Sequence, residues 1–211
     1  MKIFLDSSKV SEAKKWMPVI EGATTNPSIL LKDGSNIEEF ISVMEGKPVS
    51  VEACGDFLTD ARKYSKIPDA AIVIKVPLLN PEGGSNLSII EELTKEGIVI
   101  NCTALFSLSQ VILATAAGSR YVSLFAGRVD DEGGNYASMI EDCRNYLEED
   151  ASDTELIVGS IRTIGNVLDS VRAGAHIVTI PPNILEKMLM HRYSLDTVRQ
   201  FEEDSKKLNA R

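Results

Sequence analysis

Residues 70–77, Ala-Ala-Ile-Val-Ile-Lys-Val-Pro, form the stretch of sequence that decides the fold. The five residues before the lysine are all apolar, which is typical of a strand covered on both faces. Strands of this kind belong to parallel sheets, in which helical crossovers join one strand to the next. A single lysine, Lys75, ends the apolar run, so a charged group is expected at the end of a buried strand.

The same alternation continues along the whole chain, as short β-branched runs followed by amphipathic segments. This pattern indicates parallel strands joined by helices. We expect strands near residues 2–6, 21–25, 48–53, 70–76, 97–102, 119–124, 154–160 and 175–180. We expect helices near residues 8–17, 36–45, 56–66, 84–96, 107–117, 134–149, 164–173, 183–190 and 194–209.

Local signals support several of these boundaries. Asn26-Pro27 is typical of a strand end followed by a helix start. Ser107 and Gln110 have the spacing of a capping box, and Gly118 is expected to end the helix that follows.

Eight strand–helix units predict an α/β protein, a (β/α)8 TIM barrel with an extra C-terminal helix at about residues 194–209. No shift in composition or linker-like segment divides the chain, so residues 1–211 are expected to form one domain. A doubly wound open sheet is the alternative fold. The sequence contains neither the G-x-G-x-x-G nor the G-x-x-x-x-G-K-[ST] fingerprint, which disfavours that alternative.

Composition excludes several classes of partner. The formal net charge is −9, which argues against binding to nucleic acid or to anionic membranes. No apolar run approaches the ~20 residues of a membrane span. Cys54, Cys102 and Cys143 form no disulfide pattern, and Asp6 comes too early for a signal peptide. We therefore expect a cytoplasmic protein.

Polar residues gather at the C-terminal ends of the expected strands. In a barrel these ends share one rim, where active sites are built. Several of the residues are two positions apart, so they face the same side of their strand. The set comprises Asp6, Asn26, Glu52, Lys75, Asn101, Thr103, Ser123, Arg128, Ser160 and Arg162.

Lys75 has two interpretations. A lysine at a strand end commonly extends its ammonium group into water. Alternatively, its amine lies in surroundings of low dielectric constant, where the uncharged form is favoured and can attack a carbonyl group. The many polar residues at the same rim favour the second interpretation.

The other polar residues suit the chemistry of such a lysine. Addition to a carbonyl followed by carbon–carbon cleavage needs acid–base groups twice, and Glu52 and Asp6 are candidates. Arg128 and Arg162 suit a phosphate group, although pairing with Asp130 or Asp131 is the alternative for Arg128. The two histidines, His176 and His191, are not spaced as metal ligands, so neither a metal nor another cofactor is expected.

Taken together, the motifs resemble those of the small transaldolases and the related fructose-6-phosphate aldolases, from end to end of the chain. The matching segments are Phe4-Leu5-Asp6-Ser7, Thr24-Thr25-Asn26-Pro27-Ser28, Val49-Ser50-Val51-Glu52, Val73-Ile74-Lys75-Val76-Pro77, Glu96-Gly97-Ile98, Asn101-Cys102-Thr103, Gly127-Arg128-Val129-Asp130-Asp131 and Gly159-Ser160-Ile161-Arg162. The resemblance implies a metal-free (β/α)8 enzyme that works through a lysine imine.

The resemblance also implies a role for each residue. Lys75 would form the Schiff base with a ketose phosphate, Glu52 and Thr103 would hold a proton-shuttling water, and Asp6 would deprotonate the C4 hydroxyl. The remaining residues would bind substrate. Asn26 and Asn101 would orient hydroxyls and the enamine, Ser123 would contact the C1 hydroxyl, and the phosphate would bind to Arg128, Ser160 and Arg162.

Two activities of the family stay open, together with a third possibility outside it. A transaldolase of the pentose phosphate pathway would convert sedoheptulose 7-phosphate and glyceraldehyde 3-phosphate into erythrose 4-phosphate and fructose 6-phosphate. An aldolase would release free dihydroxyacetone, and a barrel without catalysis would only bind sugar phosphates. In the aldolase branch the positions of Glu52 and Phe125 usually hold glutamine and tyrosine, so the residues here resemble the transaldolase branch.

The resemblance further implies a homo-oligomer, a decamer of two stacked pentamers assembled through the C-terminal helix. Leu195, Val198, Phe201 and Leu208 give this helix an apolar stripe that suits a neighbouring subunit. The alternative is a helix that packs on its own barrel.

Overall fold

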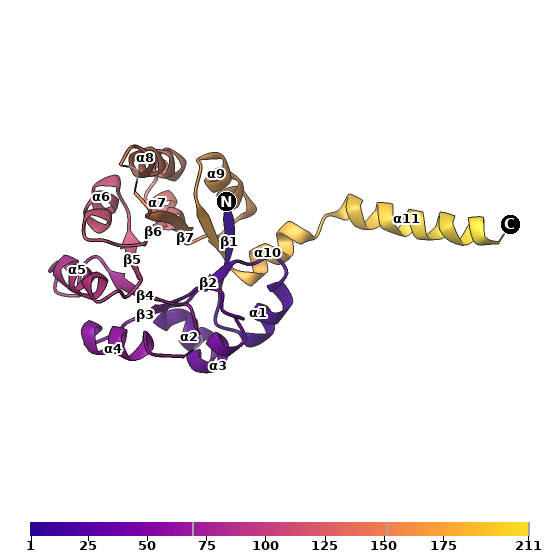
Figure 1. Ribbon diagram of the computed structural model, residues 1–211. Helices are drawn as coiled ribbons and strands as arrows, with labels where there is room; N and C mark the ends of the chain where they lie inside the picture. Colours follow the sequence, from indigo (N-terminus) through magenta and orange to yellow (C-terminus); the bar gives the residue numbers. More distant parts are fainter. Residues whose placement is uncertain (69, 151, 211) are drawn as a thin grey trace.

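The computed structural model describes residues 1–68, 70–150 and 152–210. Eight parallel strands close into a barrel in sequence order, and helices surround it (Figure 1). The predicted (β/α)8 barrel is therefore confirmed. The open-sheet alternative is wrong, because β1 pairs with β8 as well as with β2.

The strands lie close to their predicted positions. They are β1 Lys2–Asp6, β2 Gly22–Thr24, β3 Val49–Glu52, β4 Ile72–Pro77, β5 Ile100–Leu105, β6 Tyr121–Phe125, β7 Glu155–Gly159 and β8 Ile177–Ile180. The helices are α1 Val10–Trp16, α2 Pro27–Asp33, α3 Ile37–Ser42, α4 Phe57–Tyr64, α5 Leu87–Lys95, α6 Leu108–Ala116, α7 Ala126–Asp131, α8 Tyr136–Glu149, α9 Ile164–Arg172, α10 Pro182–Leu189 and α11 Arg192–Asn209.

The position of β5 differs from the prediction of residues 97–102. Gly97 has a φ of 79° and lies in the turn after α5, so the strand cannot begin there. Its pairing with β6 shifts register between Cys102 and Leu105, where Ala104 has a φ of 59°. This irregularity lets the strand continue to Leu105, so Asn101 and Thr103 both lie within it.

The predicted capping box at α6 is only half formed. The Ser107 hydroxyl oxygen accepts a hydrogen bond from the Gln110 amide at 3.3 Å. In a full capping box, the Gln110 side chain would accept a hydrogen bond from the Ser107 amide. It instead accepts one from the amide of Phe106, the residue before Ser107, at 2.7 Å.

Apolar side chains fill two separate regions. The larger one lies between the strands and the surrounding helices and includes residues such as Leu5, Ile74 and Val122. The smaller one is formed by Phe4, Ile157 and Ile177, which point into the barrel. Because residues two apart share a face of a strand, the positions after this apolar layer also point inward, and they hold the polar residues described below.

The C-terminal helix α11 projects away from the barrel (Figure 1). Every residue from His191 to Ala210 is exposed, including Val198 at 61% and Phe201 at 67%. The alternative in which this helix packs on its own barrel is therefore wrong. In the described part of the chain, no helix combines the length and apolar character needed to span a membrane.

The apolar layer inside the barrel leads to a test of the fold. A methyl group on Gly22 would lie 2.6 Å from the Phe4 ring, so Gly22→Ala should destabilise the protein by about 1–3 kcal/mol through overpacking. Gly165→Ala is the matched control, because its Cβ would make only one ordinary contact, with the N-cap residue Thr163 of helix α9. Urea denaturation measures both, and equal stability of the two variants would contradict this account of the barrel interior.

Candidate active site

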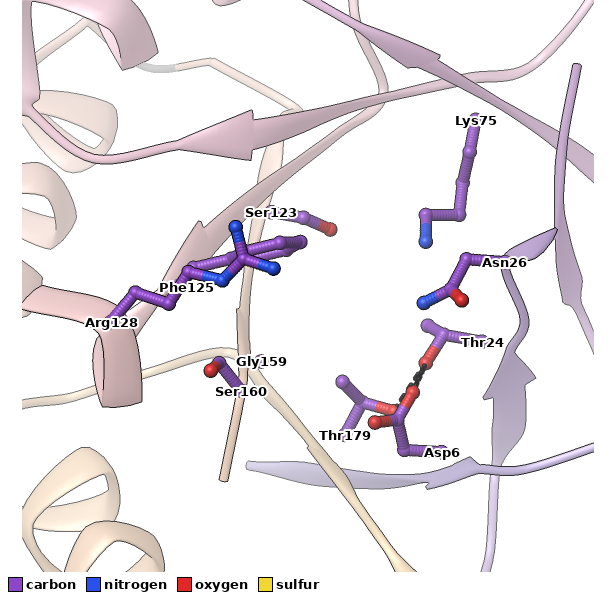
Figure 2. A pocket seen from close by; sticks show the side chains of 10 residues that line it. All are labelled: Asp6, Thr24, Asn26, Lys75, Ser123, Phe125, Arg128, Gly159, Ser160 and Thr179. Carbon is purple, nitrogen blue, oxygen red and sulfur yellow. Dashed lines mark hydrogen bonds between the residues drawn. The ribbon is translucent and has the colours of Figure 1, made fainter. Parts of the chain in front are cut away.

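A cavity of about 160 Å³ opens at the C-terminal ends of the strands. Figure 2 shows the side chains that surround it, with Lys75, Asn26 and Asp6 on one side and Arg128 and Phe125 on the other. The residues that line it are Asp6, Thr24, Asn26, Lys75, Ser123, Phe125, Arg128, Gly159, Ser160 and Thr179. They come from β1, β2, β4, β6, β7 and β8 and from the segments that follow these strands.

Among the described residues, Lys75 is the one lysine that lines this cavity. Its side chain is 4% exposed, so its amine does not extend into bulk water. The nitrogen donates a hydrogen bond to the carbonyl oxygen of Thr25 at 2.8 Å and lies 3.3 Å from a carboxylate oxygen of Glu52. Glu52 is paired with Lys75 in the β3–β4 register, which fixes the two side chains next to each other.

Asp6 belongs to a chain of hydrogen bonds across three strands. The Thr24 hydroxyl donates to Asp6 at 2.8 Å and lies 2.6 Å from the Thr179 hydroxyl. Burial raises the pKa of Asp6 above its ordinary value, the Thr24 hydrogen bond and the Lys75 charge act in the opposite direction, and Asp33 adds to the increase. A carboxylate with a raised pKa is a stronger base.

A second hydrogen-bonded group lies on the neighbouring strands. Asn101 is fully buried; its amide nitrogen donates to the Ser50 hydroxyl at 3.1 Å, and its oxygen accepts from Ser123 at 2.7 Å. Thr103, two residues further along β5, is also buried. Its buried hydroxyl has no hydrogen-bond partner among the described residues.

The two arginines have different surroundings. The Arg128 guanidinium lies 5.7 Å from the centre of the Phe125 ring, and Phe106 contacts that ring edge-on at 5.7 Å. Arg162 instead forms an ion pair with Asp131 and is half exposed. Pairing with Asp131 was the alternative considered for Arg128, whereas the structure places Arg162 in that position.

The segments that carry the arginines approach each other closely. Ser160 has a φ of 60°, which is unusual for a residue other than glycine. A side chain at Gly127 would overlap the Ser160 carbonyl oxygen. The close contact therefore requires glycine at this position of α7.

The structure thus brings most of the predicted residues together. Four predicted residues lie outside the cavity lining, namely Glu52, Asn101, Thr103 and Arg162. Of these, Glu52 contacts the Lys75 amine and Asn101 contacts Ser123. Thr179 lines the cavity but was not among the site residues expected from the sequence, although it follows the inward-facing Ile177 by two positions. Within residues 1–68, 70–150 and 152–210, no group of three or more His, Cys, Asp or Glu side chains could hold a metal ion.

Comparison of the chain with known proteins gives matches of three kinds. A probable transaldolase of Thermodesulfovibrio yellowstonii is 38% identical over 218 residues, covering 99% of both chains. A probable transaldolase of Clostridium tetani is 38% identical over 220 residues, covering 99% of this chain and all of the other. These two relatives match the whole length of the chain.

Solved structures with low sequence identity share the fold alone. An N-acetylmannosamine-6-phosphate 2-epimerase from Clostridium perfringens superposes with a TM-score of 0.58 at 12% identity, covering 95% of this chain and 92% of that one. A mandelate oxidase variant gives a TM-score of 0.59 at 15% identity, covering 85% and 63%.

The family comparison covers almost the entire chain. Residues 3–211 match the family described as transaldolase/fructose-6-phosphate aldolase, in agreement with the resemblance of the motifs around Lys75 and Asn26. The protein therefore belongs to the transaldolase/fructose-6-phosphate aldolase family.

Proposed function

We propose that the protein is a transaldolase that transfers a dihydroxyacetone unit between sugar phosphates through an imine on Lys75. The donor would be sedoheptulose 7-phosphate or fructose 6-phosphate, and the acceptor would be glyceraldehyde 3-phosphate or erythrose 4-phosphate. The observation that carries this proposal is the buried Lys75 amine in a polar cavity, 3.3 Å from the Glu52 carboxylate.

The imine would form in two steps that need proton transfer. The Lys75 nitrogen adds to the C2 carbonyl of the ketose, and the resulting hydroxyl leaves as water. Glu52 is close enough to the amine to move protons in both steps. Thr103, with its unpaired buried hydroxyl, is suited to hold the water that Glu52 uses.

Cleavage would then follow with Asp6 as the base. Asp6 takes the proton of the C4 hydroxyl, the C3–C4 bond breaks, and its electron pair moves into the imine to give an enamine. The raised pKa of Asp6 suits a base for this weakly acidic hydroxyl. The aldose phosphate leaves, and a second aldehyde accepts the three-carbon unit by the reverse steps.

The remaining residues would hold the sugar. Asn26 and Ser123 line the cavity beside Lys75, and Asn101 positions Ser123 through a 2.7 Å hydrogen bond. Arg128 and Ser160 line its other side (Figure 2) and are suited to the phosphate group. Arg162 would join them by exchanging Asp131 for the phosphate, because an exposed ion pair contributes little stability.

Transfer rather than release of dihydroxyacetone is favoured by Phe125. Release requires protonation of the enamine carbon and hydrolysis of the imine. Phe125 lies in the cavity wall and has no hydroxyl that could place a water or donate a proton there. The enamine should therefore persist until an aldehyde arrives.

Fructose-6-phosphate aldolase activity is the second candidate, because the family includes it. A barrel that binds sugar phosphates without turnover is the more distant alternative. Simple binding needs neither a buried amine nor a carboxylate 3.3 Å from it, so this alternative is disfavoured.

We also propose that the protein assembles through α11 into a homo-oligomer, a decamer of two pentamers. Helix α11 is about 27 Å long at 1.5 Å per residue. Its exposed Leu195, Val198, Phe201 and Leu208 would be covered by a second copy of the chain. Burial of each such side chain contributes about 1.5–3 kcal/mol.

We expect the protein to act in the reducing cytoplasm, since its three cysteines are free thiols.

The first prediction concerns Lys75. Borohydride treatment in the presence of fructose 6-phosphate should attach a sugar fragment to Lys75, and Lys75→Met should lower activity by about a thousandfold or more. Lys2→Met is the control, because Lys2 pairs with Glu155 at the opposite end of the barrel. Peptide mass spectrometry identifies the modified lysine, and modification of any other lysine would contradict the proposal.

The second prediction separates transfer from release. In the wild type, transfer of dihydroxyacetone to erythrose 4-phosphate should exceed its release to water. Phe125→Tyr should increase the ratio of release to transfer by about tenfold or more, because a phenol can donate a proton near the enamine.

The control for this prediction is Phe106→Tyr, which makes the same change on the neighbouring ring, outside the cavity lining. Its ratio of release to transfer should match that of the wild type. If the wild type splits fructose 6-phosphate as fast without an acceptor as with one, the transaldolase hypothesis is wrong and the aldolase hypothesis replaces it.

The third prediction concerns assembly. Light scattering should give about 230 kDa for ten copies of the 23.0 kDa chain. Val198→Glu combined with Phe201→Glu should lower this mass, because both side chains would carry charge into the proposed contact. Glu203→Gln, on the same helix, should leave the mass unchanged. A wild-type protein with the mass of a monomer would refute the assembly.

A further inference from the structure

We propose that Asp33 is a positioning residue for Asp6: it fixes the turn that follows β1 and keeps a second negative charge beside the Asp6 carboxylate. This inference rests on the proposed function, in which Asp6 accepts the proton of the C4 hydroxyl. It goes further by assigning control of that step to a residue that does not line the cavity around Lys75.

The first observation is the set of hydrogen bonds at Asp33. One of its carboxylate oxygens accepts from the Ser7 hydroxyl at 2.8 Å, from the Ser8 amide at 2.9 Å and from the Ser8 hydroxyl at 3.3 Å. Ser7 and Ser8 directly follow Asp6, and both are buried. The Asp33 side chain is only 7% exposed, so these hydrogen bonds are largely shielded from water, which strengthens them.

The second observation is the location of Asp33 in the helix. It is the last residue of α2, where the helix dipole disfavours a negative charge. Helix formation alone therefore gives no reason for an aspartate at this position. The hydrogen bonds to Ser7 and Ser8 supply the reason, and such a departure from local preference is typical of functional positions.

Helix α2 also connects two parts of the site. Its N-cap is Asn26, whose side chain accepts a hydrogen bond from the Ile29 amide at 2.9 Å and which lines the cavity around Lys75. Its other end holds the turn after Asp6 through Asp33. The helix therefore fixes the position of Asn26 relative to Asp6, on the side of the barrel where the C4 hydroxyl would be deprotonated.

The third observation is electrostatic. Asp6 and Asp33 line a common second cavity of about 310 Å³. Burial raises the pKa of Asp6 most; the hydrogen bond from Thr24 and the charge of Lys75 lower it, Asp33 raises it, and Lys32 lowers it. The other charged groups that line the second cavity are Lys9, Glu12, Lys32 and Glu186, and Lys9 is 3.9 Å from Asp33.

The consequence for the reaction follows from the direction of this effect. A negative charge near Asp6 disfavours its ionised form, so the carboxylate holds a proton more strongly once it has taken one. Asp33 therefore makes Asp6 a stronger base for the C4 hydroxyl. The acidic limb of the pH–rate profile reports the loss of the Asp6 proton. Without the Asp33 charge, this limb moves to lower pH, and deprotonation of the C4 hydroxyl slows.

The test uses Asp33→Asn in the full-length protein. This variant keeps the shape of the side chain and an oxygen that can accept hydrogen bonds, but it removes the charge. The acidic limb of kcat/KM for transfer from fructose 6-phosphate should shift to lower pH. A 13C-NMR titration of the Asp6 carboxyl should show the same shift. Asp33→Glu restores the charge and should return the limb toward its original position.

A second set of variants tests the hydrogen bonds. Ser8→Ala keeps the charge of Asp33 and removes one donor to it, so kcat should fall while the acidic limb stays in place. Asp33→Ala removes both contributions and should lower kcat by about tenfold or more. The matched control is Glu12→Gln, which removes a charge from the same cavity and should leave both the limb and kcat unchanged.

The outcomes distinguish this inference from the proposed function. Borohydride trapping on Lys75 should proceed in Asp33→Asn as in the wild type, because imine formation precedes the step that Asp6 performs. Failure of trapping in the wild type would overturn the proposed function. The role of Asp33 would be overturned by a different set of results. In Asp33→Asn, trapping would be normal, and neither the acidic limb nor the Asp6 titration would shift; in Ser8→Ala, kcat would be normal. Thermal unfolding checks that each variant is folded.

Discussion

Closure of the barrel is the constraint on which the rest of the structure depends. Because β1 pairs with β8, all eight parallel strands end at one rim, and every second side chain points inward. Phe4, Ile157 and Ile177 fill the interior below that rim. This apolar layer shields the inward-facing residues at the rim from water at the other end of the barrel. Lys75 is one of these residues, and its side chain is only 4% exposed because the barrel is closed.

The polar groups around this lysine fall into two sets that suit two kinds of proton transfer. Glu52 lies beside the amine, on the adjacent strand. Asp6 lies on β1 and is hydrogen-bonded to Thr24 and, through it, linked to Thr179. In the proposed mechanism, this separation would let Glu52 serve formation of the imine and Asp6 serve cleavage, and Asp33 would act on Asp6 alone.

Much of this architecture could be predicted from the sequence. The alternation of strands and helices, the inward spacing of Asn101 and Thr103, and the Asn26-Pro27 helix start depend on neighbouring residues only. The end of β5 could not be predicted, because it depends on a register shift against β6. Thr179 was missed for a similar reason: its hydrogen-bond partner Thr24 is 155 residues away along the chain.

The sequence by itself determined the barrel, its rim of polar residues and the family, because periodicity and motifs are local properties of the chain. Only the tertiary structure decided which charged groups meet. It paired Arg162 rather than Arg128 with Asp131, placed Asp33 against Ser7 and Ser8, and left α11 without cover from its own barrel. Such contacts join residues from different strand–helix units, so their geometry exists only once the barrel has closed.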